Sequence, residues 1–218
     1  MSDSMSSDEI VLYSHPMSRG RVVRWMLEEL GQPYSVELVG YGPAMKSERY
    51  RAINPMGKVP ALVHRGNVVT ETAAICAYLA DAFPEAGLAP APGSPARAPY
   101  YRWLFFGAGP LEAAASNRAM GFEVPEDKRA MMGYGCYEDV LAALEGWLDG
   151  RSFLVGDAFS AADVYIGSQL GFGMMFGTVE KRPAFEKYWL ALAARPAYQR
   201  AATTDDALVA EIQAKGGG

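Results

Sequence analysis

The sequence is poor in the side chains that bind metals or form disulfides. It has two cysteines, Cys76 and Cys136, and two histidines, His15 and His64. The cysteines lie far apart in segments with helical periodicity, which is typical of buried thiols in a reducing cytoplasm rather than of a disulfide framework. Since tetrahedral zinc needs four good ligands at a suitable spacing, we expect no metal.

Long apolar runs and blocks of like charge are also missing. No stretch reaches the roughly 18 consecutive apolar residues of a membrane helix, and the first ten residues, MSDSMSSDEI, are polar and acidic, unlike a signal peptide. The formal net charge of −5 argues against nucleic acid and against an anionic membrane surface as partners. The sequence thus predicts a cytoplasmic protein that acts on small molecules.

The N-terminal part of the chain alternates between strand and helix signals. Strands are indicated by short runs of β-branched and aromatic residues, and helices by apolar residues three and four positions apart. In chain order, the expected elements are a strand at 9–14, a helix at 18–30, a strand at 34–39, a short helix at 46–53, strands at 59–63 and 68–70, and a helix at 70–83. This order, βαβαββα, predicts a small α/β domain over residues 9–84.

A proline-rich segment separates this domain from a helical one. Proline fits neither a helix interior nor a central strand, so residues 85–99 predict a linker. After it, only helical periodicity is found. We expect helices at 100–120, 126–148 and 160–174, and two shorter helices near the end. The sequence therefore predicts an all-α C-terminal domain over residues 100–215.

The helix expected after residue 160 begins with a capping signature. Ser160 and Asp163 have the spacing of a capping box, and Phe159 and Val164 are placed for a hydrophobic staple. We interpret this pair as structural rather than catalytic. Loss of the Ser160 cap should cost about 1 kcal/mol.

The segment INPMGKVPALV (53–63) is a candidate peptide-binding edge. Pro60 stands at the start of a strand, where a missing N–H is tolerated. A cis Val59–Pro60 bond would turn the backbone of Val59 outward, so that its N–H and C=O can pair with an extended peptide. An ordinary trans proline at a strand start is the alternative interpretation.

The segment TETAAICAYL (70–79) is a candidate site for an amino-acid head group. Glu71 and Thr72 fall at a helix N-terminus, where free N–H groups and the helix dipole favour a carboxylate. The Thr72 hydroxyl adds a donor, and Glu71 suits an ammonium. The alternative is a plain helix cap with an acidic residue in its first turn.

Taken together, these segments resemble the cytosolic glutathione transferases. The resemblance is carried by YSHPMSRGRVVRW (13–25), NPMGKVPALV (54–63), ETAAICAYLAD (71–81), FLVGDAFSAADVYIG (153–167) and RPAFEKYWLALAARPAYQRA (182–201). It covers nearly the whole chain. It implies a thioredoxin-like N-terminal domain, an all-α C-terminal domain with an electrophile pocket, and a cytoplasmic homodimer. It also implies a detoxifying transferase that ionises the thiol of glutathione, its co-substrate, and adds it to a small hydrophobic electrophile.

Such a transferase must favour the thiolate, because a thiol with a pKa near 8.5 is only a few per cent ionised at pH 7. Lowering that pKa by about two units requires about 2.7 kcal/mol. Ser18, at the start of the first helix, is the predicted donor; Ser14, at the end of the strand, is its rival, and backbone N–H groups are the third candidate. Counted without gaps, the serine of the theta-like and zeta-like classes falls on Met17. The turn holds no cysteine, so the resemblance is to a serine-type branch, theta-like, zeta-like or a related bacterial one.

The resemblance also assigns the residues that bind glutathione. It places the backbone of Val59, with Pro60 cis, on the cysteinyl part, and Glu71 and Thr72 on the γ-glutamyl head group. Besides Ser18, two lysines complete the set: Lys58 is expected at the glycyl carboxylate, and Lys46 as a further charged contact.

The electrophile is expected on the first helix after the linker. Tyr101, Leu104 and Phe105 form an apolar stripe there, which core packing explains equally well. Two other functions stay open. One is a glutathione-binding carrier or interaction protein without catalysis, and the other is a glutathione-dependent isomerase or lyase, whose Ser-Ser-Cys stretch is not found in this sequence.

Overall fold

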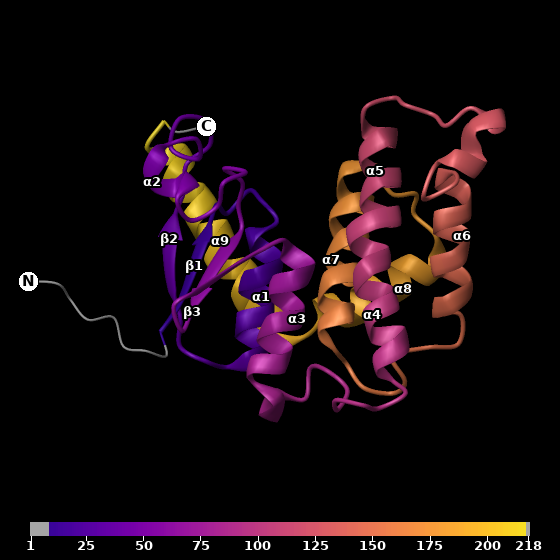
Figure 1. Cartoon of the computed structure of the whole chain (residues 1–218), viewed down its shortest axis with the longest axis horizontal. Coiled ribbons are helices and arrows are strands. Elements are labelled where there is room, and N and C mark those ends of the chain that lie inside the picture. The colour runs from indigo at the N-terminus through magenta and orange to yellow at the C-terminus, as the bar shows by residue number, and fades with distance from the viewer. Residues whose placement is uncertain (1–8, 217–218) are drawn as a thin grey trace, which may run out of the picture. The chain divides into compact units, whose positions relative to one another are not determined.

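The computed structural model describes residues 9–216, which divide into two compact units (Figure 1). The first unit combines the N-terminal segment through Ala86 with the C-terminal segment from Arg195, and the second spans Gly87–Ala194. The sequence analysis instead assigned everything after the linker to one helical domain. The chain therefore returns to its first unit after completing the second.

The first unit is built on a four-stranded mixed sheet. Its elements are β1 (Ile10–Ser14), α1 (Gly20–Leu30), β2 (Ser35–Leu38), α2 (Glu48–Arg51), β3 (Ala61–His64), β4 (Asn67–Thr70), α3 (Thr72–Ala82) and the 3₁₀ turn η1 (Pro84–Ala86). The strand order is β2-β1-β3-β4, with β1 and β2 parallel and the other pairs antiparallel. This is the βαβαββα order expected for a thioredoxin-like domain, and the prediction is confirmed.

Strand register brings three connections to one edge of this sheet. Tyr13 lies opposite Ala61, and Ala61 lies opposite Thr70. The residues that leave β1, enter β3 and leave β4 are therefore neighbours across the sheet. Helices α1 and α3 both begin just after this edge, so their N-termini also lie there.

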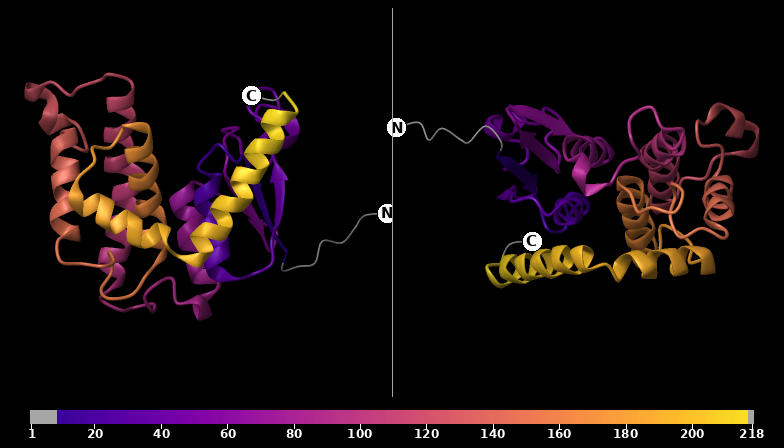
Figure 2. Two further views of the ribbon diagram at one scale, coloured as in Figure 1. Left: turned by 180° about the vertical axis from the view of Figure 1, so that it is seen from behind. Right: turned by 90° about the horizontal axis from the view of Figure 1, so that it is seen from below.

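The C-terminal helix α9 (Pro196–Ala214) packs along α1 in the first unit (Figure 2). It is the second of the two helices expected near the end, but at 19 residues it is not shorter than the helices before it, contrary to the prediction. Apolar periodicity could predict the helix but not the unit it would cover, because its partners on α1, both the ion pairs and the ring contact of Tyr198 with Trp25, are distant in sequence.

The second unit is helical, as predicted. Its elements are α4 (Arg97–Phe106), the π-helical turn η2 (Gly107–Leu111), α5 (Glu112–Ala119), the 3₁₀ helix η3 (Glu126–Met131), α6 (Tyr137–Leu148), α7 (Ala161–Phe176) and α8 (Pro183–Ala193). The helix expected at 100–120 contains the π turn, where Pro110 supplies no N–H. The helix expected at 126–148 is interrupted after η3, and Gly135 takes a positive φ of 68° there. No helix within residues 9–216 has the length and apolarity to cross a membrane.

The capping box at the start of α7 is confirmed. Asp163 is fully buried and accepts hydrogen bonds from the N–H and hydroxyl of Ser160, at 2.9 and 2.8 Å. It also accepts from the Leu154 N–H at 2.8 Å and the Tyr188 hydroxyl at 2.7 Å. Desolvation nevertheless raises the pKa of this carboxyl. Its role is to join the start of α7 to the preceding loop and to α8.

Candidate functional site

The turn between β1 and α1 is closed by the Ser18 side chain. Its hydroxyl donates to the His15 carbonyl at 2.6 Å and accepts from the Gly20 N–H, the first of α1, at 3.0 Å. The Ser18 N–H also donates to the His15 carbonyl, at 3.1 Å. Ser18 was predicted at the cap of this helix, but it lies one residue before the N-cap, Arg19, and its proton is committed to a backbone carbonyl. It must release that carbonyl before it can donate to a ligand.

Ser14, the rival donor, is buried beneath the same turn. Its side chain is 1% exposed, and its Oγ has no hydrogen-bond partner among residues 9–216. The Oγ faces Gly20 so closely that a Cβ built there would lie 1.9 Å away. Glycine at the first position of α1 thus makes room for Ser14, and the Ser14 hydroxyl has a proton to give but little access to a ligand.

His15 orients the turn from within. It is buried, and its Nδ1 accepts from the Met17 N–H at 3.2 Å, so the neutral ring carries its proton on Nε2. Tyr41 closes over it, with ring centroids 4.4 Å apart, and donates to the Met17 carbonyl at 2.8 Å. Burial lowers the pKa of His15 from its ordinary value. These contacts describe a turn residue rather than a base.

The loop before β3 is held by residues that sequence reasoning missed. The Val59–Pro60 bond is cis, as predicted. Asn54 is buried; its side chain donates to the Lys58 carbonyl at 2.7 Å and accepts from the Met56 N–H at 3.1 Å. Tyr50 also donates to the Lys58 carbonyl, at 2.7 Å. The Asn-Pro pair at 54–55 was the available signal, since asparagine before proline favours a turn.

The two predicted lysines take different roles in this loop. Lys46 Nζ donates to the carbonyls of Met56 and Gly57, both at 2.9 Å. An ammonium has three N–H donors, so these bonds leave one for a ligand. The Lys58 side chain is exposed, and only its backbone carbonyl takes part in fixing the loop.

Glu71 and Thr72 lie at the start of α3, as predicted. Glu71 is exposed and has a φ of 66°, in the left-handed region that non-glycine residues rarely adopt. Such a conformation costs on the order of 1 kcal/mol and is concentrated at functional sites. Thr72 is buried at the first helical position. The strained residue therefore stands where the helix N-terminus meets the sheet edge.

The three residues predicted for an electrophile pocket do not share one environment. Tyr101 is 44% exposed and Phe105 73% exposed, on one face of α4. Leu104 is 3% exposed and belongs to the core of the second unit. Core packing, the alternative noted from sequence, explains Leu104, and only the aromatic pair offers a surface.

The Cys76 thiol and the side chains that could bind a metal do not contribute to this site. Cys76 is buried, and burial raises the pKa of its thiol to about 12. Within the described residues, no group of three or more His, Cys, Asp or Glu side chains is placed to hold a metal ion.

Two family models match the chain. One is described as Glutathione S-transferase, N-terminal domain, and matches residues 17–82; the other, Glutathione S-transferase, C-terminal domain, matches residues 136–196. Glutathione S-transferase A of Pleuronectes platessa is 29% identical over 185 residues, which cover 81% of this chain and 82% of that protein. Maleylacetoacetate isomerase of Pseudomonas aeruginosa is 30% identical over 179 residues, covering 78% and 82%. A sphingomonad glutathione S-transferase, solved with glutathione, matches with a TM-score of 0.73 at 30% identity, covering 90% of this chain and 98% of that one.

Proposed function

This chain belongs to the glutathione S-transferase family and is a glutathione transferase, and from that premise we propose that the sheet edge described above binds glutathione and ionises its thiol. One observation carries the proposal. The Tyr13–Ala61–Thr70 register brings the β1–α1 turn, the loop before β3 and the start of α3 together. These are the parts that the family resemblance assigns to the sulfur, the peptide backbone and the amino-acid head group.

The γ-glutamyl head group binds at the start of α3 in this proposal. Its carboxylate takes the Thr72 hydroxyl and the first N–H groups of the helix, and its ammonium pairs with Glu71. The backbone of Val59, two residues before β3 begins, pairs with the cysteinyl part. The exposed Lys58 ammonium and the remaining donor of Lys46 serve the glycyl carboxylate.

For the thiolate donor we propose Ser18, which leaves the His15 carbonyl and donates to the sulfur. Ser18 is partly exposed, whereas Ser14 is too deeply buried to reach a ligand without movement of the turn. The helix N-terminus adds a favourable field for the anion. Together, the Ser18 hydrogen bond and the field of the helix N-terminus have to supply about 2.7 kcal/mol for a two-unit fall in the thiol pKa.

Several finer points belong to the same proposal. The exposed aromatic pair Tyr101 and Phe105 supports a hydrophobic electrophile, with Leu104 packed behind it. We further propose a homodimer in the cytoplasm, as is typical of the family, and chemistry that needs no metal.

The test is the ultraviolet absorbance of the thiolate of bound glutathione, titrated across pH for the wild type, Ser18→Ala and Ser14→Ala. We expect a wild-type thiol pKa well below 8.5 that returns toward this value in Ser18→Ala alone. A return only in Ser14→Ala would transfer the role to that residue. If neither variant changes a lowered pKa, the backbone N–H groups are the donors.

A carrier without catalysis is the second candidate, because the Ser18 proton is already committed to the His15 carbonyl. It predicts that wild-type protein binds glutathione and leaves the thiol pKa near its free value. A glutathione-dependent isomerase is the third, suggested by the similarity to maleylacetoacetate isomerase. It predicts turnover of a cis-unsaturated diketo acid without net consumption of glutathione.

A further inference from the structure

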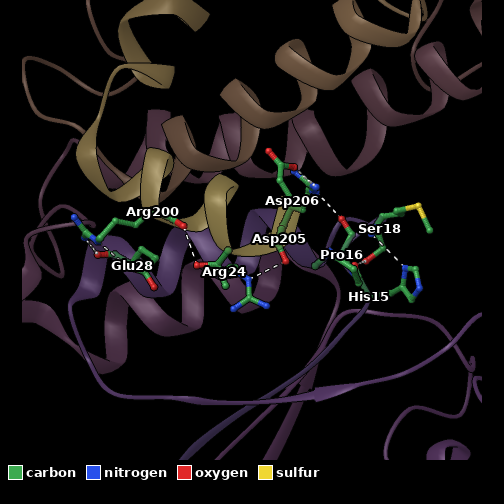
Figure 3. A network of polar contacts seen from close by, with 12 residues as sticks. His15, Pro16, Ser18, Arg24, Glu28, Arg200, Asp205 and Asp206 are labelled. Carbon is green, nitrogen blue, oxygen red and sulfur yellow. Dashed lines mark hydrogen bonds and ion pairs between the residues drawn. The ribbon is translucent and has the colours of Figure 1, made fainter. Parts of the chain in front are cut away.

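Four ion pairs tie α1 to the C-terminal helix and its N-cap residue, Arg195; they run along α1 and along the first part of α9. From the far end of α1 toward its start, they are Arg195 with Glu29, Arg200 with Glu28, Arg24 with Asp205, and Arg21 with Asp206. Figure 3 shows the part of this row from Arg200 and Glu28 through Arg24 and Asp205 to Asp206, and its continuation into the turn that holds Pro16 and Ser18. The N–O distances are 2.6, 2.9, 2.9 and 2.6 Å, in the same order.

The last pair differs from the others because its arginine has a second partner in the turn. The Nε of Arg21 donates to the carbonyl of Pro16, and its terminal nitrogen donates to Asp206 Oδ1. The planar guanidinium therefore spans the turn and α9 with two N–H groups of fixed relative direction. Pro16 lies between His15, whose carbonyl holds the Ser18 hydroxyl, and Ser18 itself.

We propose that Arg21 and Asp206 are positioning residues for thiol activation: α9 fixes the Arg21 guanidinium on the Pro16 carbonyl and so holds the turn in the geometry that presents Ser18 to the sulfur. The inference rests on the proposed glutathione site and adds a contribution of the C-terminal helix to it. Neither residue touches the reacting atoms in this scheme. Their effect is transmitted through the backbone of the turn.

The proposal can be separated from a simple field effect by the sign of the change. Removing the Asp206 carboxylate leaves the Arg21 charge less compensated, and a field effect alone would then lower the glutathione thiol pKa further. Loss of positioning moves the pKa the other way, toward the free thiol. Arg21→Lys keeps the charge but cannot reproduce the fork that joins the two partners, so it should behave like Asp206→Ala.

The chain offers a matched control in Arg200→Gln. The Arg200–Glu28 pair joins the same two helices and is also partly exposed. Glu28 lies seven residues beyond Arg21, about 10 Å along the helix. The Arg200→Gln variant therefore shows the effect of losing one α1–α9 ion pair that has no contact with the turn.

The experiment measures, for wild type, Asp206→Ala, Arg21→Lys and Arg200→Gln, the thiol pKa of bound glutathione, the KM for glutathione and kcat with a fixed excess of a generic aryl halide. We expect Asp206→Ala and Arg21→Lys to raise the thiol pKa and to weaken glutathione use by about fivefold, the effect of a good exposed ion pair. Arg200→Gln should match the wild type in both readouts, and equal thermal unfolding of Asp206→Ala and Arg200→Gln would exclude a difference in folding.

Four outcomes would overturn the inference. The link to the turn carries no function if the wild type lowers the thiol pKa and neither Asp206→Ala nor Arg21→Lys changes it. The same conclusion follows if Arg200→Gln changes the thiol pKa as much as these two variants do. A fall in the thiol pKa of Asp206→Ala would assign the effect to the field of Arg21 instead. If the wild type itself leaves the thiol pKa at the free value, the proposed function fails first, and the inference falls with it.

Discussion

The buried pair of Arg24 and Asp205 allows a sharp test of what holds α9 on the first unit. Their side chains are 4% and 1% exposed, and one hydrogen bond of 2.9 Å joins Arg24 Nε to Asp205 Oδ1. Removing one partner leaves the other charge buried and uncompensated, which costs about 3–5 kcal/mol. We expect this loss in both Arg24→Met and Asp205→Leu.

The double variant should recover most of that loss. Asp205 Oδ2 has no hydrogen-bond partner among residues 9–216, so the native pair is incompletely compensated for its own desolvation. Replacing both members by apolar side chains removes the charges together. The stability of the double variant should therefore lie within about 1 kcal/mol of the wild type or above it.

Urea unfolding, followed by far-ultraviolet circular dichroism, measures these changes. With a slope of about 2 kcal/mol per molar urea, each single variant should lower the midpoint by about 2 M. Burial raises the pKa of Asp205, so in Arg24→Met this carboxyl takes up a proton as the pH falls toward its ordinary value of 3.8. The penalty in that variant should shrink at low pH. Single losses below about 1 kcal/mol, or a double loss equal to their sum, would refute the reasoning.

Three further predictions concern other buried groups. Asp163→Ala leaves four buried donors without their acceptor and should cost about 4 kcal/mol in urea unfolding, far more than the exposed Asp157→Ala on the preceding loop. Burial lowers the pKa of His15, so as the pH falls the unfolded chain binds a proton there before the folded chain does, and wild-type stability should fall as the pH drops below 6.5. In His15→Asn this part of the pH dependence of stability should vanish. An unchanged pH dependence would contradict its assignment to His15. Gly20→Ala places a Cβ 1.9 Å from the Ser14 hydroxyl and should cost about 1–3 kcal/mol in thermal unfolding. Ser14→Gly should relieve this clash, so the Gly20→Ala, Ser14→Gly double variant should lose less stability than the sum of the single losses. Additive losses would show that the two residues do not clash.

Local signals in the sequence were sufficient for much of the fold. The βαβαββα order follows from periodicity, and the capping box of Ser160 and Asp163 follows from spacing alone, because both depend on residues close together in the chain. The π turn at Gly107–Leu111 gives only a weak signal in the sequence, since a helix with one widened turn keeps nearly the same apolar spacing.

What depended on contacts distant in sequence could not be predicted. The apolar stripe at 101–105 did not reveal that Leu104 is buried in the core while Tyr101 and Phe105 stay exposed. Which side of a helix is buried can be predicted only when the elements that pack against it are known. The charged residues of α9 find their partners on α1 across more than half of the chain. Ser18 was expected at the helix cap and lies one residue before it, and its bond to the His15 carbonyl follows from the turn geometry and not from any motif.

The discontinuous first unit has a consequence for synthesis on the ribosome. Its sheet and α1 are made early, but α9 follows only after the residues of Gly87–Ala194 have been added, which takes roughly 5–20 s at about 5–20 residues per second. Throughout that interval Arg24 lacks Asp205, and the charged face of α1 is open to solvent or to a chaperone. The nascent thioredoxin-like part is therefore expected to remain protease-sensitive until the C-terminal helix emerges, so that the second unit has the first opportunity to fold to completion.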